Sequence, residues 1–160
     1  MALVRLSQES DIEDLEGRMR TADLVELKAH GVQARSALRV GLVMSKPCFS
    51  IEHKGRCIGM FGVTPEPVDP QTGLVWLLGS DEIQDISRQF LRESREWLER
   101  IGSQYELLTN VVHEDNHLHH KWLRFLGFTF ILFSELPSFC LRLFWVVLGI
   151  ARQLHIALAL

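Results

Sequence analysis

Four histidines and two acidic residues crowd one short segment of the chain. They are His113, Glu114, Asp115, His117, His119 and His120. Imidazole and carboxylate groups bind zinc when several of them converge on one point, and His117 and His120 stand one helical turn apart. No second ligand cluster follows, however, and the other histidines are scattered. A solvated helix start, where acidic residues favour the positive end of the helix dipole, explains the same residues, so we expect no metal site here.

The sequence offers little support for nucleophilic catalysis. The Gly-x-Ser-x-Gly turn that exposes a catalytic serine is absent, and no cysteine has a histidine beside it. The odd number of cysteines (Cys48, Cys57 and Cys140) favours reduced thiols in a cytoplasmic setting. Cys48 and Cys57 fall in predicted strands, where buried thiols are the ordinary interpretation. The spacing leaves open whether these two face one another across a hairpin.

The charged residues give no electrostatic footprint for nucleic acid. Basic residues number 17 and acidic residues 20, for a formal net charge of −3. One predicted helix alternates arginines with glutamates at spacings of three and four, which predicts an exposed face with salt bridges. These residues are Arg88, Arg92, Arg95 and Arg100, with Glu93, Glu96 and Glu99. We therefore expect no nucleic-acid partner. The four tryptophans lie in apolar segments and are predicted core residues.

The elements that must position these side chains follow from hydrophobic spacing and turn residues. The first half predicts a strand over Leu3–Leu6, a helix opened by a Ser10–Glu13 capping box, a helix capped by Thr21 and ended by Gly31, and a helix over Ala34–Met44. After Pro47 it predicts a hairpin, Cys48–His53 and Arg56–Val63, turning at Lys54–Gly55, and then a proline-rich loop over Thr64–Gly73.

The second half alternates strands and helices. It predicts a buried strand over Leu74–Leu78, a long helix capped by Ser80 or Asp81 and ended by Gly102, a strand over Leu107–Val112, a helix from Asp115 or Asn116 to Leu126 ended by Gly127, and two strands within Phe128–Phe133 and Phe139–Leu148. This order predicts an α+β fold in which a mixed, largely antiparallel sheet is flanked by helices.

The composition fits one domain followed by an apolar end. The chain has 160 residues, 47% of them hydrophobic and 23% charged, which is enough for one core. From Phe128 to Leu160 it is nearly all apolar, but Glu135, Pro137, Arg142 and Arg152 interrupt the run, so we expect no membrane span. The first residues show no secretory signal. We expect one domain over residues 1–149 and a tail over 150–160 that forms a short helix on the sheet or mediates association.

The segment from Leu107 to Phe128 resembles the last strand–helix unit of the GNAT acetyltransferase superfamily. In that family a strand leads to an asparagine, a helix and then Gly-Phe, and here Asn116 precedes Gly127 and Phe128 at the family spacing. The order of the preceding elements also agrees. The resemblance implies a GNAT-like fold, and with it acetyl-CoA as the ligand to be considered.

A more specific resemblance is to a phage and prophage family with a GNAT-like fold, similar to the small internal virion protein of podovirus-type phages. The segments that carry it are Ala22-Asp23 with Glu26, Ala29-His-Gly31, Met60-Phe-Gly-Val63, Trp76-Leu-Leu-Gly79 with Asp81, Phe90-Leu-Arg92 with Ser94-Arg95, and Asn110. This resemblance implies a role in virion structure, assembly or infection, with phage or host proteins as partners and the host cytoplasm or the virion as location.

Two departures from the GNAT pattern bear on activity. GNAT enzymes have a Gly-rich turn after the fourth strand, whose amides bind the pyrophosphate of acetyl-CoA, whereas this chain has Gly79-Ser-Asp-Glu-Ile-Gln-Asp85. Many of them also place a tyrosine, the general acid, seven residues after the asparagine, and that position is Leu123 here. The only tyrosine, Tyr105, does not replace it by spacing. If acetyl-CoA binds, the resemblance assigns its contacts to Leu78, Gly79, Ser80 and Asn116.

The sequence therefore supports two functions. The first is a non-catalytic GNAT-like protein that acts through contacts with other proteins, and no catalytic residue is assigned. The alternative is a divergent N-acetyltransferase that transfers an acetyl group from acetyl-CoA to an amine.

Overall fold

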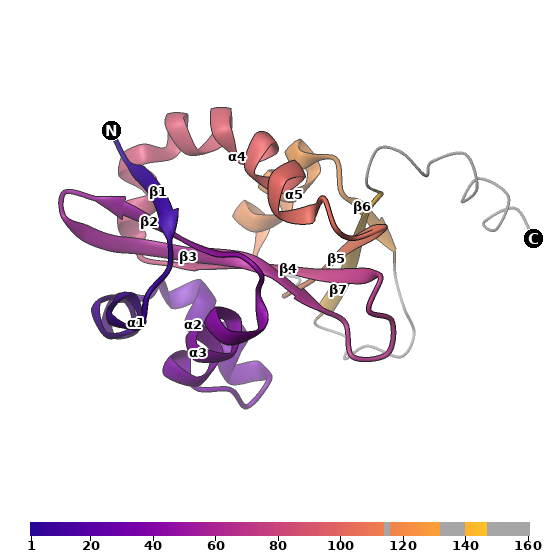
Figure 1. Ribbon diagram of the computed structural model, residues 1–160, viewed down its shortest axis with the longest axis horizontal. Helices are drawn as coiled ribbons and strands as arrows, with labels where there is room; N and C mark the ends of the chain where they lie inside the picture. The colour runs from indigo at the N-terminus through magenta and orange to yellow at the C-terminus, as the bar shows by residue number, and fades with distance from the viewer. Residues whose placement is uncertain (114–115, 132–139, 147–160) are drawn as a thin grey trace, which may run out of the picture.

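A single mixed sheet runs through the molecule, with helices on both of its faces (Figure 1). The computed structural model describes residues 1–113, 116–131 and 140–146. The strands are β1 (Leu3–Leu6), β2 (Cys48–His53), β3 (Arg56–Pro65), β4 (Thr72–Gly79), β5 (Leu107–His113), β6 (Thr129–Ile131) and β7 (Cys140–Val146). Their order in space is β1-β2-β3-β4-β5-β7-β6, and every neighbouring pair is antiparallel except β4 and β5. The predicted α+β class with a largely antiparallel sheet is confirmed.

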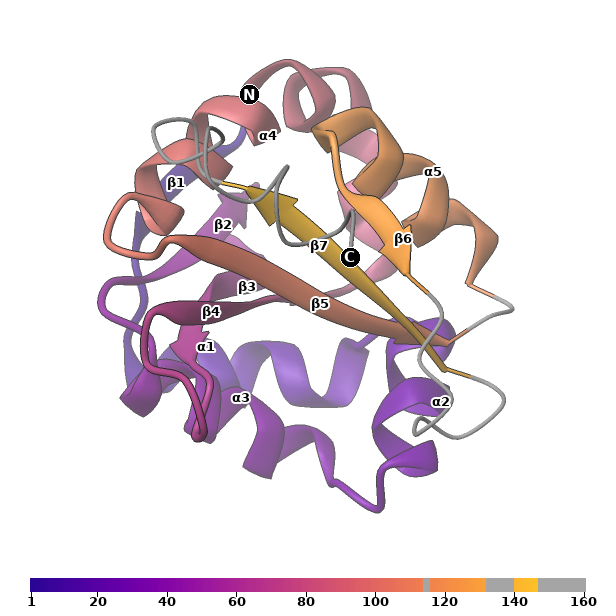
Figure 2. The same ribbon diagram turned by 90° about the vertical axis from the view of Figure 1, so that its right-hand side faces the viewer.

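The helices divide between the two faces of the sheet. They are α1 (Glu9–Leu15), α2 (Thr21–Ala29), α3 (Ala34–Met44), α4 (Ser87–Gly102) and α5 (His117–Leu126), with 3₁₀ helices η1 (Glu16–Arg18) and η2 (Asp81–Ile86). Helices α1, α2 and α3 cover one face, and α4 and α5 cover the other (Figures 1 and 2). Because the central strands are covered on both sides, they are apolar on both sides, as the continuous run in β4 predicts.

Strand alternation builds two hydrophobic cores. Val75 and Leu77 of β4 point toward α4 and α5, where they join Leu98, Leu108 and Leu123 among others. Trp76 and Leu78 point the other way, toward a cluster that includes Ile12, Leu15, Leu38 and Met60. Successive residues of one strand therefore pack into opposite layers, and the sheet separates the two cores and contributes side chains to both.

Several predicted boundaries are confirmed. Strand β1, strand β2 and helix α3 begin and end where the sequence predicts. The hairpin turns at Lys54 and Gly55, whose φ angles are 52° and 75°; two such residues make the type I′ turn that suits the twist of a hairpin. Gly31 and Gly127 end their helices with φ angles of 68° and 97°.

The predicted starts of the first two helices are wrong. Helix α1 begins at Glu9, and its cap is Gln8, two residues before the expected cap Ser10. The Gln8 amide donates to the Asp11 carboxylate over 2.9 Å, and Ser10 and Glu13 do not cap the helix. Asp11 is fixed there because Arg5 and Ser50 also donate to it, at 2.8 Å. Thr21 is the first residue of α2 rather than its cap, which is Arg20.

The predicted long helix is also divided. Residues Asp81–Ile86 form the 3₁₀ helix η2, and α4 begins only at Ser87. Gly79 explains part of this, because the Ile83 side chain lies over it: a Cβ on Gly79 would stand 2.2 Å from Ile83 Cδ1. The tight turn after β4 therefore folds Ile83 back onto the end of its own strand.

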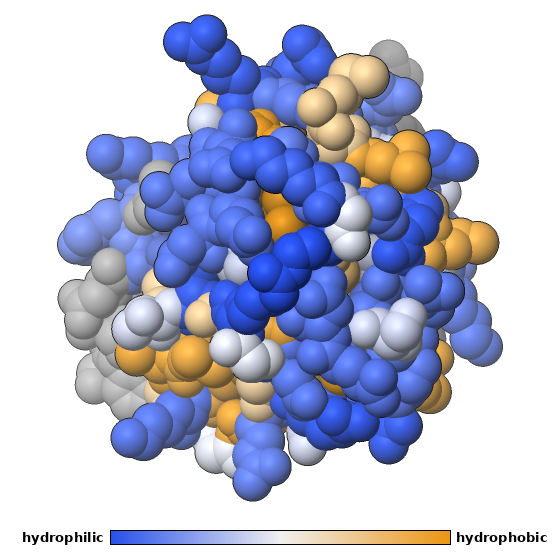
Figure 3. All heavy atoms as spheres, turned by 90° about the vertical axis from the view of Figure 1, so that its left-hand side faces the viewer, coloured by the Kyte–Doolittle hydropathy of each residue, from blue (hydrophilic) through white to orange (hydrophobic). Residues whose placement is uncertain are grey.

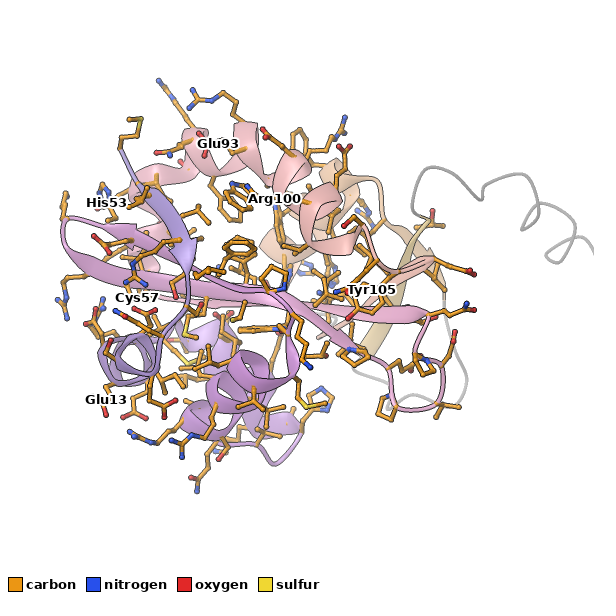
Figure 4. The ribbon with its side chains drawn as sticks, viewed as in Figure 1. Glu13, His53, Cys57, Glu93, Arg100 and Tyr105 are labelled. Atoms are coloured by element: carbon orange, nitrogen blue, oxygen red, sulfur yellow. The ribbon has the colours of Figure 1, made fainter. Side chains whose placement is uncertain are left out.

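The charged face predicted on α4 differs from what the structure shows. All residues of α4 are described, and its ion pair joins Arg92 to the adjacent Glu93 rather than residues three or four apart. Arg95 lies over the Phe125 ring and donates to the Phe125 carbonyl at 2.7 Å. Arg100 lies over Phe49 and Trp97, above the sheet in Figure 4. These arginines pack their guanidinium groups on aromatic rings. Phe49 and Trp97 belong to the core beneath α4, whereas Phe125 is exposed.

The cysteines of the hairpin do not face one another. Cys48 lies opposite Gly62 and Cys57 lies opposite Glu52, so the two thiols are at different positions along the hairpin. Both thiols are free and buried in the core on the α1 side, where Figure 4 shows Cys57. Burial raises the pKa of Cys57 to about 11, so its thiol is protonated at neutral pH. Cys140 begins β7.

Hydrophilic side chains dominate the face of the molecule shown in Figure 3. Ion pairs link β1, α1, η1, α3 and the hairpin to one another: Arg5–Glu52, Arg56–Asp14, Arg35–Glu16 and Arg39–Glu9. Within the described ranges, no helix is long and apolar enough to cross a membrane. The predicted tail over residues 150–160, and the ends of the two predicted final strands, lie outside the described residues.

Candidate functional site

The parallel strands β4 and β5 separate after a short paired stretch, and we call the space between them the β4–β5 gap. Thr72, Gly73 and Leu74 pair with Leu107, Leu108 and Thr109. Beyond these pairs β4 continues to Gly79 and β5 to His113 without pairing to each other. β5 stays paired with β7 over its whole length, so the gap opens only toward β4. The carboxyl ends of parallel strands are where open α/β sheets bind ligands.

Asn110 marks the point where the strands part. Its side-chain amide donates to the Val75 carbonyl over 3.1 Å, in a buried position. The side chain thus replaces the next backbone bond of the ladder and holds the strands at a greater separation than a paired rung would.

The backbone of β4 presents hydrogen-bonding groups to the gap. In an antiparallel ladder, successive residues direct their N–H and C=O alternately toward and away from the partner strand. The Gly79 amide and carbonyl bond to Asp23 of α2 and to Arg20, the residue before α2, so the Gly79 backbone faces away from β3. Because the direction alternates along the strand, the Leu77 backbone faces away from β3 as well. Among the described residues, neither β5 nor α2 supplies a partner to the Leu77 amide and carbonyl. Leu77 therefore offers one donor and one acceptor to an extended ligand.

The start of α2 closes the far end of the gap. The Gly79 amide donates to Asp23 Oδ2 over 2.9 Å, and the Gly79 carbonyl accepts from the Arg20 amide over 2.8 Å. Arg20 and Asp23 also form a bidentate ion pair, at 2.8 to 3.1 Å. We call this arrangement of Arg20, Asp23 and Gly79 the α2 clamp.

Asp23 is a buried carboxylate, 1% exposed. Burial raises the pKa of its carboxyl above the usual value, and Arg20 and the Gly79 amide offset that effect only in part. An ion pair in such a place is costly to break from one side, because the remaining charge is left buried and unpaired. The clamp is therefore a fixed part of the fold.

The turn after β4 is already hydrogen-bonded within the protein. The Ser80 amide donates to the Ile58 carbonyl over 2.8 Å, and the Ser80 hydroxyl donates to Glu82 at 3.0 Å. Glu82 in turn is paired with Arg18, while Asp81 at the start of η2 is exposed. The backbone that the GNAT resemblance assigns to pyrophosphate therefore carries acidic side chains, and its first amides are engaged.

These contacts locate the residues predicted to bind acetyl-CoA. Gly79 and Ser80 lie at the end of β4, where protein groups bond their amides. Leu78 packs its side chain against the core on the α1 side. Asn116 lies across the gap as the cap of α5, where its side chain accepts from the His119 amide at 3.2 Å. The structure thus brings all four residues to the borders of the gap; acetyl-CoA contact with them stays a prediction.

Helix α2 also reaches the other border of the gap. The Asn116 side chain donates to Glu26 over 2.9 Å, which joins α5 to α2. Asp23 and Glu26 stand one turn apart on α2, so this single helix contacts the end of β4 and the start of α5. Sequence reasoning missed the role of both residues. They carried the phage-family resemblance, but nothing local indicates that they border a site, since Asp23 is 56 residues from Gly79 in the chain.

His119 lies in the first turn of α5 with both ring nitrogens buried and, among the described residues, without a hydrogen-bond partner. Its ring packs against Trp122, with the centroids 5.4 Å apart. Burial, with smaller contributions from the charges of Arg20 and His120, lowers the pKa of His119 to about 3. At neutral pH the imidazole is therefore uncharged, with one nitrogen that can donate a hydrogen bond and one that can accept it.

Leu123, at the position of the family's tyrosine, is completely buried in the core beneath α5. An apolar cavity of about 50 Å³ lies in the same layer, lined by Val75, Leu77, Phe90 and Trp122 among other residues. The position of the general acid is thus part of the core. Within the ranges that the structure describes, no group of three histidine, cysteine or acidic side chains is arranged to hold a metal ion.

Comparison with known proteins identifies the fold. No family model matches the chain, and no curated protein is recognisably similar to it in sequence. Solved structures do match over nearly the whole chain. The ribosomal-protein-S18-alanine N-acetyltransferase from Escherichia coli has a TM-score of 0.63 at 12% identity, over 92% of this chain and 94% of that one. The GNAT domain of an S. lividans protein has a TM-score of 0.65 at 15% identity, over 91% and 90%.

A Salmonella typhimurium structure, described with its cofactor acetyl-CoA, has a TM-score of 0.58 at 12% identity, over 91% of this chain and 94% of that one. Identities this low establish the fold alone. The chain has the GNAT fold, as the sequence predicts. Phage origin and virion incorporation are not addressed by any of these matches.

Proposed function

We propose that this protein binds the pantetheine arm of an acyl thioester in the β4–β5 gap and transfers the acyl group to an amine. The observation that carries the proposal is the open edge of β4 at Leu77, which presents a backbone N–H and C=O to the gap. A pantetheine arm is an extended chain with amide groups along it, so it can pair with this edge as an added strand would. The fold of the solved acetyltransferases supports the same use of the gap.

The protein's contribution to such a reaction is placement. An amine attacks the thioester carbonyl, the C–N bond forms as the C–S bond breaks, the sulfur leaves as a thiolate, and the amine releases its proton to water. A thiolate is a fair leaving group, since thiols have a pKa near 8.5. Holding the thioester in a fixed position against the amine contributes to the rate even without a side chain that donates a proton. Leu123, buried and aliphatic, donates none.

The proposal is tested by backbone NMR of the full chain titrated with acetyl-CoA and with S-acetylpantetheine. We expect the Leu77 amide resonance to shift on addition of at least one of these thioesters, while amides of the distant β2–β3 turn at Lys54 and Gly55 do not. Release of free thiol that depends on an added amine then tests transfer. Absence of any shift at millimolar thioester would exclude binding in the gap.

A second candidate function is a non-catalytic role in a phage particle or during infection, as the resemblance to the internal virion protein family suggests. The observation that favours it is the combination of the α2 clamp on Gly79 with the buried Leu123. At the two positions where this chain departs from the GNAT pattern, the side chains therefore make structural contacts within the protein. Partners would then be phage or host proteins. Mass spectrometry of purified particles tests incorporation, and particles that lack the chain would contradict it.

A further inference from the structure

The α2 clamp occupies the place where a diphosphate would have to bind, and this bears on which acyl donor the gap accepts. In the GNAT resemblance the amides after the fourth strand receive the pyrophosphate of acetyl-CoA. Here the amide at the start of that turn, the Gly79 N–H at the last residue of β4, donates to the Asp23 carboxylate. A carboxylate on that amide stands in for the anion, so a phosphate could reach it only by displacing Asp23 or by lying against it.

Neighbouring charges add to this exclusion. At the end of β4 and in the turn after it, the described carboxylates include Asp23, Asp81 and Glu82, and the guanidiniums include Arg18 and Arg20. Both guanidiniums already bond carboxylates, so this border is net acidic. Like charges at contact distance in a partly buried site repel strongly, because the local dielectric is far below that of water.

The helix start that normally attracts phosphate has also moved. A long helix presents free amides and a positive dipole end to an anion. In this chain the six-residue 3₁₀ helix η2 stands between β4 and the first residue of α4, Ser87. The dipole end of α4 therefore does not lie directly at the end of β4.

The middle of the gap shows no such exclusion. The Leu77 amide and carbonyl face it, Asn110 spaces its strands, and the neutral His119 ring at its α5 border brings no charge. These groups suit uncharged amides. The two parts of the gap thus differ in the chemistry that they accept.

We propose that the gap selects a pantetheine thioester that carries no diphosphate, and that Asp23 is the residue that excludes coenzyme A. The inference rests on the proposed function, since it names the donor class for that same gap. Two sources share this chemistry: a free small thioester, and a pantetheine arm carried on a protein through a single phosphodiester.

The test compares S-acetylpantetheine with acetyl-CoA by calorimetry on the full wild-type chain, so it does not depend on any variant folding. We expect S-acetylpantetheine to bind at least as tightly as acetyl-CoA. Binding of acetyl-CoA ten-fold or more tightly would overturn the inference and leave the proposed function standing. Failure of both ligands to bind any form of the protein would overturn the proposed function, and the inference with it.

The Asp23→Asn variant then tests whether Asp23 excludes coenzyme A. Asp23→Asn keeps an oxygen that can accept from Gly79 but removes the negative charge, so it should tighten acetyl-CoA binding at least ten-fold and change S-acetylpantetheine binding by less than three-fold. Asp69→Asn, the same change in the β3–β4 loop, where Asp69 bonds Thr72, should change neither. An equal effect of Asp23→Asn on both ligands would contradict the assigned role.

A third ligand distinguishes a free thioester from a pantetheine arm carried on a protein. An acetylated carrier protein that binds at least ten-fold more tightly than S-acetylpantetheine supports the carried arm as the donor. Equal or weaker binding supports the free thioester.

Discussion

His119 is a source of acid sensitivity that can be traced to one side chain. Its pKa is about 3 in the folded protein, against an ordinary value of 6.5. Between these values the unfolded chain binds a proton that the folded chain does not. The free energy of unfolding is therefore unaffected by this group above pH 6.5 and falls as the pH drops below it, by up to about 1.4 kcal/mol per pH unit.

We predict that His119→Gln removes this part of the pH dependence, because glutamine does not titrate. Urea denaturation near pH 7 and near pH 5 should show the difference in stability between the two conditions shrinking by up to about 2 kcal/mol relative to the wild type. His30→Gln makes the same change at an exposed position and should keep the wild-type difference. An unchanged difference in His119→Gln would contradict the assignment.

The buried thiols permit a second prediction at this scale. Burial raises the pKa of both Cys48 and Cys57, that of Cys57 to about 11, and only a thiolate attacks a disulfide reagent. In a Cys140→Ser background we expect the folded protein to react with such a reagent at least about 100-fold more slowly than the urea-unfolded protein. A rate within ten-fold of the unfolded rate would show that these thiols are accessible.

At the scale of elements, α3 lies against β4 through a position where only glycine fits. A Cβ on Gly41 would stand 2.3 Å from the Trp76 ring, which is held by a 2.8 Å hydrogen bond from its Nε1 to Ser45. Alanine is the better helix former by about 1 kcal/mol, but overfilling a packed interior costs about 1–3 kcal/mol. The packing cost is therefore the larger effect.

We accordingly predict that Gly41→Ala lowers the free energy of unfolding by up to about 2 kcal/mol, measured by urea denaturation. Gly17→Ala is the matched control, since a Cβ on Gly17 has no neighbour within 4 Å, and it should leave stability unchanged or slightly increased. A stabilising effect of Gly41→Ala would mean that the Trp76 ring moves freely.

The same scale shows what the sequence could and could not predict. Helix α3 and the Lys54–Gly55 hairpin were predictable because periodicity and turn residues are local signals. The capping box at Ser10 failed because Arg5 and Ser50 fix Asp11 instead. Contacts between distant parts of the chain decide such choices, and a single sequence does not display them.

For the candidate site, too, local features were predictable from the sequence and long-range contacts were not. The sequence predicted the segments at the end of β4 and the start of α5, because their spacing resembles a known family. It did not predict the α2 clamp, whose partners Asp23 and Gly79 are 56 residues apart, nor η2, where Glu82 pairs with Arg18 across 64 residues. Family spacing identifies where a ligand could lie, while the partners of each amide have to come from the structure.

At the scale of the whole molecule, the two cores share one sheet, and we predict that they unfold together. Leu38 and Leu123 are completely buried, one in each core. Leu38→Ala and Leu123→Ala should each lower stability by about 2–5 kcal/mol. In both variants the unfolding curves followed by tryptophan fluorescence and by far-UV circular dichroism should coincide, as two-state unfolding requires. Separate transitions would show that the layers fold independently.

The short pairing of β4 with β5 has a consequence for synthesis on the ribosome. The pairings of β1 with β2, β2 with β3 and β3 with β4 all lie within residues 3–79, so these strands can assemble before β5 has left the exit tunnel. The last of them would then be a bare edge, open to pairing with another nascent chain. Arg20 and Asp23 belong to the part already made, and they cover the tip of that edge at Gly79. The contact that borders the finished gap therefore also occupies the Gly79 end of the edge that β4 leaves open until β5 is made.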